Sequence, residues 1–175
     1  MKKKIVSIAL ACALFAVAVA GGTLAYFTAN DAKDNNFTVG NAAIELQEPS
    51  WNADNAKDMY PGQTIAKDPQ VKNTGKNPVF IRVKIVNPKD VDVIYNEMSD
   101  KWAQEGEYYY YKEAVAPGAT TAPLFKSFTL STETENGINE AQQIKVSAEA
   151  VQSQGFTGEV GNVAEIAGWF HTCGL

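Results

Sequence analysis

The 175-residue sequence contains only one histidine and two cysteines, and this scarcity excludes several kinds of site. The zinc-protease motif His-Glu-x-x-His needs two histidines, and His171 stands alone. A closed zinc site takes four ligands and an open catalytic site takes three, whereas His171 and Cys173 would supply two. The glycines are scattered through turns and form no phosphate loop or dinucleotide fingerprint. We therefore expect a protein that is not an enzyme and that needs no cofactor.

Basic residues are also few: 15 lysines and arginines stand against 20 acidic residues, for a net charge of −5. A negative chain is repelled by nucleic acid and by anionic membranes, so neither is an expected partner. Calcium is the one metal left open, because acidic residues gather in two loops. Neither loop has the ligand spacing of an EF-hand, and solvated acidic loops are the preferred explanation. The residues concerned are Asp54, Asp58 and Asp68 in one loop, and Glu133, Glu135 and Glu140 in the other.

The N-terminus has the three parts of a secretory signal. Three lysines (2–4) precede an apolar run over residues 5–20, and small residues follow it. Thr23 and Ala25 occupy the −3 and −1 positions, so we predict a signal peptide over residues 1–25 and a mature chain that begins at Tyr26. A retained membrane anchor is the alternative, but the run is shorter than the roughly 20 residues that span a bilayer. Lipid attachment at Cys12 is a second alternative, with a poor preceding sequence.

Cleavage at this position would leave a single cysteine, Cys173, so no disulfide could form within the mature chain. An exported protein without disulfides depends on its core, on metal, or on assembly. Whether Cys173 forms a bridge between molecules stays open at this point.

Period-2 alternation of apolar residues predicts a chain made mainly of strands. The clearest predicted strand covers residues 78–87, where Val79, Ile81, Val83 and Ile85 share one face, as in a half-buried strand. The other predicted strands cover residues 37–48, 64–73, 91–95, 108–111, 123–131 and 142–152. The segments 49–58 and 96–106 are polar connections, and Pro-Gly turns stand at 60–63 and 116–119.

The tail carries the one helical pattern. Val163, Ile166, Ala167 and Phe170 recur at helical spacing, and Asn162 precedes them as an N-cap, with Glu165 three residues on. We predict an antiparallel jelly-roll or immunoglobulin-like β-sandwich of about seven or eight strands with a short helix over 163–170. The mature chain divides into a sandwich domain over 26–153, whose N-terminal strand covers 26–47, and a tail over 154–175.

Four consecutive tyrosines occupy residues 108–111. Aromatic faces suit stacking on sugars or on a partner protein. An ordinary aromatic strand is the alternative, since alternate tyrosines of a strand would then face the core.

Several segments of the sequence resemble the family of exported bacterial proteins matured by the signal peptidase SipW, which includes the biofilm fibre protein TasA and the camelysin-type surface proteins. The segments are Gly-Gly-Thr-Leu-Ala-Tyr-Phe-Thr (21–28), Asn-Phe-Thr-Val-Gly (36–40), Tyr-Pro-Gly-Gln-Thr (60–64), Val-Lys-Asn-Thr-Gly (71–75), Pro-Val-Phe-Ile-Arg-Val (78–83), Ala-Pro-Gly-Ala-Thr-Thr-Ala-Pro-Leu-Phe (116–125) and Ile-Lys-Val-Ser-Ala-Glu-Ala-Val-Gln (144–152). The resemblance spans most of residues 1–152 and leaves the tail uncovered.

The resemblance implies a jelly-roll-like protein secreted from a Gram-positive-type bacterium to the cell surface or biofilm matrix. In fibre-forming members, the freed N-terminal segment inserts as a strand into the next subunit. Here the donor would run from Tyr26 to about Gly40, with Tyr26, Phe27, Phe37 and Val39 as the assembly residues. Partners would be copies of itself or other matrix and surface proteins, besides the export and signal-peptidase machinery.

Two alternatives to a structural subunit stay open. The first is a monomeric surface module that binds a ligand or glycan and keeps its N-terminal strand in its own sheet. The second is a surface metalloprotease, an activity ascribed to camelysin relatives. The sequence lacks the usual zinc ligands, so we do not transfer that activity.

Overall fold

The computed structural model describes residues 42–134 and 142–175. By internal contacts the chain separates into two units, Met1–Thr38 and Val39–Leu175, and every described residue belongs to the second. The predicted signal peptide therefore lies outside the described residues. So do the predicted cleavage and assembly residues, which are Thr23, Ala25, Tyr26, Phe27, Phe37 and Val39.

The described chain is mainly β, as predicted, with nine strands rather than seven or eight. The elements in chain order are β1 (Ile44–Gln47), the 3-10 helix η1 (Ala53–Ala56), β2 (Thr64–Ala66), β3 (Gln70–Asn73), β4 (Val79–Val86), β5 (Val93–Asn96), β6 (Trp102–Glu105), β7 (Tyr108–Tyr111), β8 (Ser127–Leu130), β9 (Lys145–Gln152) and α2 (Val163–Thr172). No helix among residues 42–134 and 142–175 is long and apolar enough to cross a membrane.

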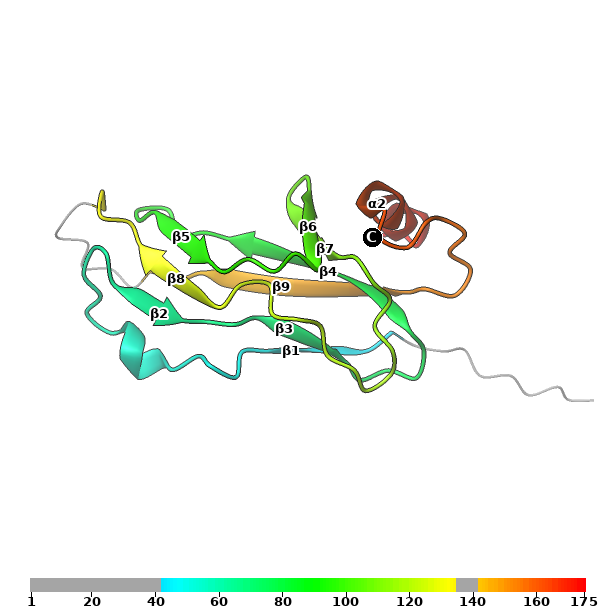
Figure 1. Cartoon of the computed structure of the whole chain (residues 1–175), viewed down its shortest axis with the longest axis horizontal. Helices are drawn as coiled ribbons and strands as arrows, with labels where there is room; N and C mark the ends of the chain where they lie inside the picture. Colours follow the sequence, from blue (N-terminus) through cyan, green and yellow to red (C-terminus); the bar gives the residue numbers. More distant parts are fainter. Residues whose placement is uncertain (1–41, 135–141) are drawn as a thin grey trace, which may run out of the picture. The chain divides into compact units, whose positions relative to one another are not determined.

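All the strand pairs are antiparallel, and they form sheets of order β1-β3, β2-β8-β5 and β6-β7-β4-β9. The first two sheets follow each other in one layer, because the chain before β8 runs antiparallel to β3 and β2. The Thr121 amide donates to the Val71 carbonyl at 2.9 Å, and the Lys67 amide donates to the Lys126 carbonyl at 3.1 Å. Pro69 lies between β2 and β3 and splits the predicted strand 64–73, since proline lacks the amide donor of a ladder. The four-stranded sheet forms the opposite layer (Figure 1).

The two Pro-Gly segments form the predicted turns. In the first, the Gln63 amide donates to the Tyr60 carbonyl at 3.0 Å, and Gly62 has a φ of 87°. In the second, the Ala119 amide donates to the Ala116 carbonyl at 3.0 Å, and Gly118 has a φ of 78°. Both glycines occupy the third turn position, where a positive φ excludes most side chains.

The main hydrophobic core lies between the two layers. Its largest contributors are buried apolar side chains that face inward from β3 in one layer, from the four-stranded sheet in the other, and from the segments between β7 and β8. They are Val71, Val79, Ile81, Val83, Trp102, Tyr111, Val115, Leu124 and Phe125. The apolar face predicted for residues 78–87 is thus confirmed.

A second core lies on the outer face of the four-stranded sheet, where α2 packs. Phe80, Tyr110 and Val151 meet Ile166, Ala167 and Phe170 of the helix. The helix begins at the predicted residue and carries the predicted N-cap, since the Asn162 side chain accepts a hydrogen bond from the Glu165 amide.

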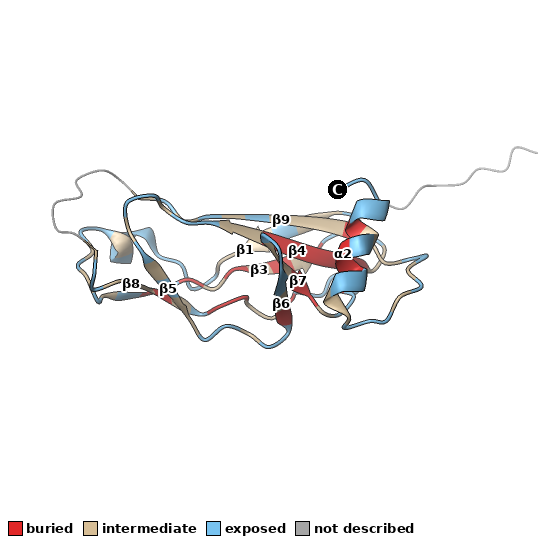
Figure 2. Ribbon diagram, turned by 90° about the horizontal axis from the view of Figure 1, so that it is seen from above, coloured by how far each residue is buried: buried red, intermediate tan, exposed pale blue. Residues whose placement is uncertain are grey.

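The second core corrects the prediction of a half-buried strand over residues 78–87. Phe80 and Arg82 were expected to face solvent, yet they are only 1% and 5% exposed. The reason is that α2 covers the face of β4 that alternation left outside (Figure 2). The two segments predicted to be polar connections also contain secondary structure. The strand β6 lies within residues 96–106, and the 3-10 helix η1 lies within residues 49–58.

Candidate functional site

The first candidate site is the pair of sheet edges formed by β1 and β9, which contact each other. Among the described strands, β9 pairs only with β4, and β1 pairs only with β3. β9 is eight residues long and stands last in its sheet. A long edge strand presents a row of backbone donors and acceptors that invites pairing with another chain.

The hydrogen-bond phase of β9 tells which residues face the open side. The Ser153 amide donates to the Pro78 carbonyl at 3.0 Å, so the backbone groups of Ser153 point toward the β4 side. In an antiparallel pair, successive residues alternate between the two sides of the strand. The amide and carbonyl groups of Val146, Ala148 and Ala150 therefore point away from β4, where no described strand pairs with them.

The same reasoning applies to β1. The Thr74 amide donates to the Ala43 carbonyl at 2.9 Å, which sets the phase of the β1–β3 ladder. Ile44 and Leu46 then direct their amide and carbonyl groups away from β3. Among the described strands, none pairs with that side of β1.

The residues with outward backbone groups also have inward side chains. Ile44, Leu46, Val146, Ala148 and Ala150 all pack against the main core, and all remain only partly buried. Figure 2 shows the contrast with β4, which is buried over most of its length while β9 is mostly intermediate or exposed. Along this side the core is thus incompletely covered, and an added strand with alternate apolar side chains would cover it.

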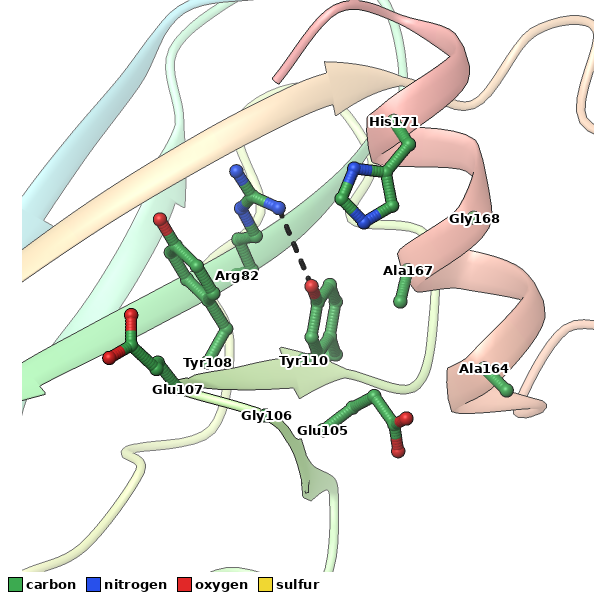
Figure 3. A pocket seen from close by; sticks show the side chains of 10 residues that line it. All are labelled: Arg82, Glu105, Gly106, Glu107, Tyr108, Tyr110, Ala164, Ala167, Gly168 and His171. Carbon is green, nitrogen blue, oxygen red and sulfur yellow. Dashed lines mark hydrogen bonds between the residues drawn. The ribbon is translucent and has the colours of Figure 1, made fainter.

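The second candidate site is a pocket between α2 and the β6–β7 hairpin, with a volume of about 420 Å³. Figure 3 shows its wall of sheet residues facing one side of the helix. The residues that line it are Arg82, Glu105, Gly106, Glu107, Tyr108, Tyr110, Ala164, Ala167, Gly168 and His171. The volume falls in the range of roughly 300–1,000 Å³ that is usual for small-molecule sites.

Arg82 is the charged group at the centre of this pocket. Its Nε donates to Glu149 Oε2 at 2.7 Å, and its Nη2 lies 2.6 Å from the same oxygen. Nη1 donates to the Tyr110 hydroxyl at 3.4 Å. The guanidinium also lies over the rings of Tyr108, at 4.0 Å, and Phe170, at 4.6 Å. Burial works against the charge, but hydrogen bonds to Tyr110 and Glu149 prevail and raise the pKa of Arg82, so it stays cationic.

The rim of the pocket carries one further ion pair. Lys84 Nζ lies 2.7 Å from Glu107 Oε2. Their hydrogen bond raises the pKa of Lys84 and lowers that of Glu107, so both stay charged at neutral pH. Glu105 has no ion-pair partner within the part of the chain that the structure describes.

Sequence reasoning missed this pocket. Alternation placed Arg82 on the face of the predicted strand 78–87 opposite the apolar one, and His171 was considered as a zinc ligand and set aside. The available signals were an arginine in the middle of a mainly apolar strand and, further along the chain, the run of tyrosines at 108–111. The tyrosine run does form a strand, β7, and Tyr110 and Tyr111 are buried on its two faces.

Two of the acidic residues considered for calcium, Asp54 and Asp68, have local partners. Asp54 pairs with Lys57 at 2.6 Å. Asp68 accepts hydrogen bonds from the amide and the hydroxyl of Ser50, both at 2.8 Å. Glu135 and Glu140 lie outside the described residues. Across residues 42–134 and 142–175, no three His, Cys, Asp or Glu side chains gather in a way that could hold a metal ion.

Comparison with known families decides the classification. The family model described as "Camelysin metallo-endopeptidase" matches residues 1–105. The chain belongs to this family. The resemblance to the TasA and camelysin proteins is thereby confirmed. Membership of the camelysin family suggests a secreted protein of the cell surface or extracellular space.

The match covers residues 1–105, up to the end of β6, and it leaves β7, β8, β9 and α2 outside. No curated protein matches the chain. No solved structure matches it either.

The family's description implies a metal, and the residues that the structure describes do not fit one. The whole sequence has a single histidine, and among the described residues His171 gathers no second and third ligand. A catalytic zinc site needs three protein ligands. We therefore derive no hydrolytic step from this chain.

Proposed function

We propose that this camelysin-family chain is a non-enzymatic structural subunit of the bacterial cell surface or biofilm matrix. After cleavage behind Ala25, the N-terminal segment 26–40 of one copy would pair with the open β1–β9 side of the next copy. The observation that carries the proposal is that β1 and β9 both present backbone groups with which no described strand pairs, from residues whose side chains face the core.

The chemistry of the proposed donor agrees with that surface. Backbone hydrogen bonds supply the affinity of an added strand, and alternate side chains fix its register. Phe37 and Val39 stand on the same face of an extended chain, and Thr38 stands on the other. Phe37 and Val39 would therefore cover the partly buried residues of β1 and β9.

The direction of the contact favours a filament. The donor segment and the acceptor edges are different surfaces, so one copy donates to a second, which donates to a third. Such a head-to-tail contact does not close unless the rotation between subunits happens to form a ring. The signal peptide would hold the segment until cleavage, which makes proteolysis the switch for assembly.

The experiment compares mature protein (26–175) with a form that begins at residue 42, by electron microscopy and sedimentation. We expect filaments from the first and monomers from the second. Phe37→Asp and Val39→Asp should abolish filaments, because each would bury a charge against the core. Thr38→Asp is the matched control on the opposite face of the same segment and should assemble normally. Equal filament yield from all four variants would refute the proposal.

The acceptor edge is tested separately. Ala148→Pro removes an amide that points away from β4 and leaves the β4–β9 ladder its bonds. A synthetic peptide of residues 26–40 should bind the 42–175 form one to one and should not bind Ala148→Pro in that form. If the peptide binds both equally, β9 is not the acceptor, whatever the filaments do. Metal analysis and a casein-cleavage assay on the same material test the protease alternative.

A further inference from the structure

The pocket between α2 and the β6–β7 hairpin has no role in strand exchange, and its shape needs an explanation. Ala164, Ala167, Gly168 and His171 stand three or four residues apart, so they form one stripe of the helix. A glycine inside a helix costs about 1 kcal/mol relative to alanine. A Cβ added at Gly168 would meet no heavy atom within 4 Å, and the same holds for Gly106 on the opposite wall. Close packing therefore does not require glycine at 168, and the absent side chain leaves the pocket open there, whereas the φ of 61° at Gly106 favours glycine by itself.

Two buried polar groups at the pocket have hydrogen-bonding capacity left over. Tyr110 is 3% exposed, and its hydroxyl accepts from Arg82. Its own O–H proton has no acceptor among the described residues. Arg82 carries five N–H donors and is 5% exposed, and three of these donors are used toward Glu149 and Tyr110. Each guanidinium nitrogen thus has a partner, and the two remaining N–H groups can still donate to a ligand.

The charges around the pocket decide which class of ligand fits. Arg82 is neutralised by Glu149 and Lys84 by Glu107, and Glu105 adds one more negative charge at the rim. An anionic ligand would be repelled by the one negative charge of Glu105 that these ion pairs leave over. A cationic ligand would satisfy Glu105 but would offer no acceptor to Tyr110 or Arg82. A neutral ligand with hydroxyl groups both accepts from the buried donors and donates to the rim carboxylate.

We infer that this pocket binds a neutral sugar unit of a polysaccharide. The hydroxyl groups of the sugar accept from the Tyr110 hydroxyl and the Arg82 guanidinium at the inner wall and donate to Glu105 at the rim. The sugar sits beside the ring of Tyr108, which is half-buried, lines the pocket and carries the Arg82 guanidinium over its face. His171 lies on the same side of the pocket as the Arg82 guanidinium and supplies a ring nitrogen to a further hydroxyl (Figure 3).

The test is a titration of mature protein (26–175), followed by backbone-amide and side-chain NMR. The probes are glucose, galactose, mannose, N-acetylglucosamine, N-acetylgalactosamine and rhamnose, each at up to about 50 mM, which detects the millimolar affinities expected for a single unit. Galacturonate and lysine serve as the anionic and cationic comparisons. At least one neutral sugar should shift the amides of Gly106 and Gly168 together with the ring signals of His171 and Tyr110. No shift by any neutral sugar, or stronger shifts by galacturonate or lysine, would overturn the inference.

Three variants separate binding from folding. Gly168→Leu fills the pocket and improves helix propensity, so it should weaken binding at least tenfold while the protein keeps its melting temperature. Thr172→Leu places a leucine at an exposed position of the same helix that does not line the pocket, and this variant should bind normally. Tyr110→Phe removes the donor and should weaken binding about tenfold, as expected for a lost buried hydrogen bond. If Gly168→Leu and Thr172→Leu bind equally well, the sugar sits elsewhere and the inference fails.

Discussion

Replacement of Phe170 by alanine tests whether α2 belongs to the same cooperative unit as the sandwich. Phe170 is fully buried, and its ring lies 5.6 Å from the ring of Tyr110 and 4.6 Å from the Arg82 guanidinium. Phe-to-Ala changes in a core cost about 3–5 kcal/mol. That loss is a large share of the roughly 5–15 kcal/mol that stabilises a typical domain. With a urea m-value of about 2 kcal/mol/M, the unfolding midpoint should fall by about 2 M.

The tryptophans allow each core to be followed separately. Trp102 belongs to the main core, and Trp169 packs against the second core and donates to the Gln152 carbonyl at 2.8 Å. Urea unfolding is measured by fluorescence in two backgrounds, one that retains only Trp102 and one that retains only Trp169. We expect the two probes to report the same transition before and after Phe170→Ala, with equal shifts. Thr172→Ala is the control, because Thr172 is exposed on the same helix.

One result would refute this reasoning. If Phe170→Ala removes the Trp169 transition and leaves the Trp102 transition in place, α2 unfolds on its own. The helix would then contribute nothing to the stability of the sandwich, although α2 buries Phe80 of the central strand β4.

Three further predictions concern local features. Gly118→Ala should lower the free energy of unfolding by about 1 kcal/mol, because φ is 78° there and no neighbour hinders the new methyl group; an unchanged urea midpoint would contradict it. Asn162→Ala should cost about 1 kcal/mol through loss of the helix cap, and circular dichroism checks it, with Asn162→Asp as the variant that keeps the cap. Burial raises the pKa of Tyr95 from 10.0 to about 12; the native state then holds this proton longer than the unfolded state, so stability falls between these pH values. After allowance for partial exposure, the free energy of unfolding falls by about 1–2 kcal/mol. Between about pH 9 and about pH 11, the urea midpoint of Tyr95→Phe should therefore drop less than that of the wild type.

The features that could be predicted from the sequence are those fixed by neighbouring residues. Gly62 and Gly118 define their turns because the positive φ is a local demand. The apolar face of β4 follows from period-2 alternation, and the stripe on α2 follows from helical spacing with Asn162 as its cap. Each of these signals is contained in a window of a few residues.

The features that escaped prediction depend on contacts between distant segments. Alternation around Arg82 is consistent with a solvated face, and only the packing of a helix some 80 residues later buries that face. The strand β6 has one apolar anchor, Trp102, and gains its strand geometry by pairing with β7. Neither fact is available from local composition, which is why the pocket was missed along with the second core.

The positions of the two candidate sites predict how they act together. In the sheet of order β6-β7-β4-β9, the pocket lies at the β6–β7 side, and the proposed acceptor edge lies at β9 on the opposite side. A strand added at β9 extends the sheet sideways and does not cover the face beneath α2. Each subunit of a filament should therefore bind a single sugar unit with the same affinity as the monomer. A long neutral polysaccharide that engages several subunits should bind filaments at least a hundredfold more tightly than monomers. Sedimentation of filaments with labelled polysaccharide, beside the 42–175 form and Gly168→Leu filaments, measures this gain. Equal retention of the polysaccharide by wild-type and Gly168→Leu filaments would show that the pocket does not supply it.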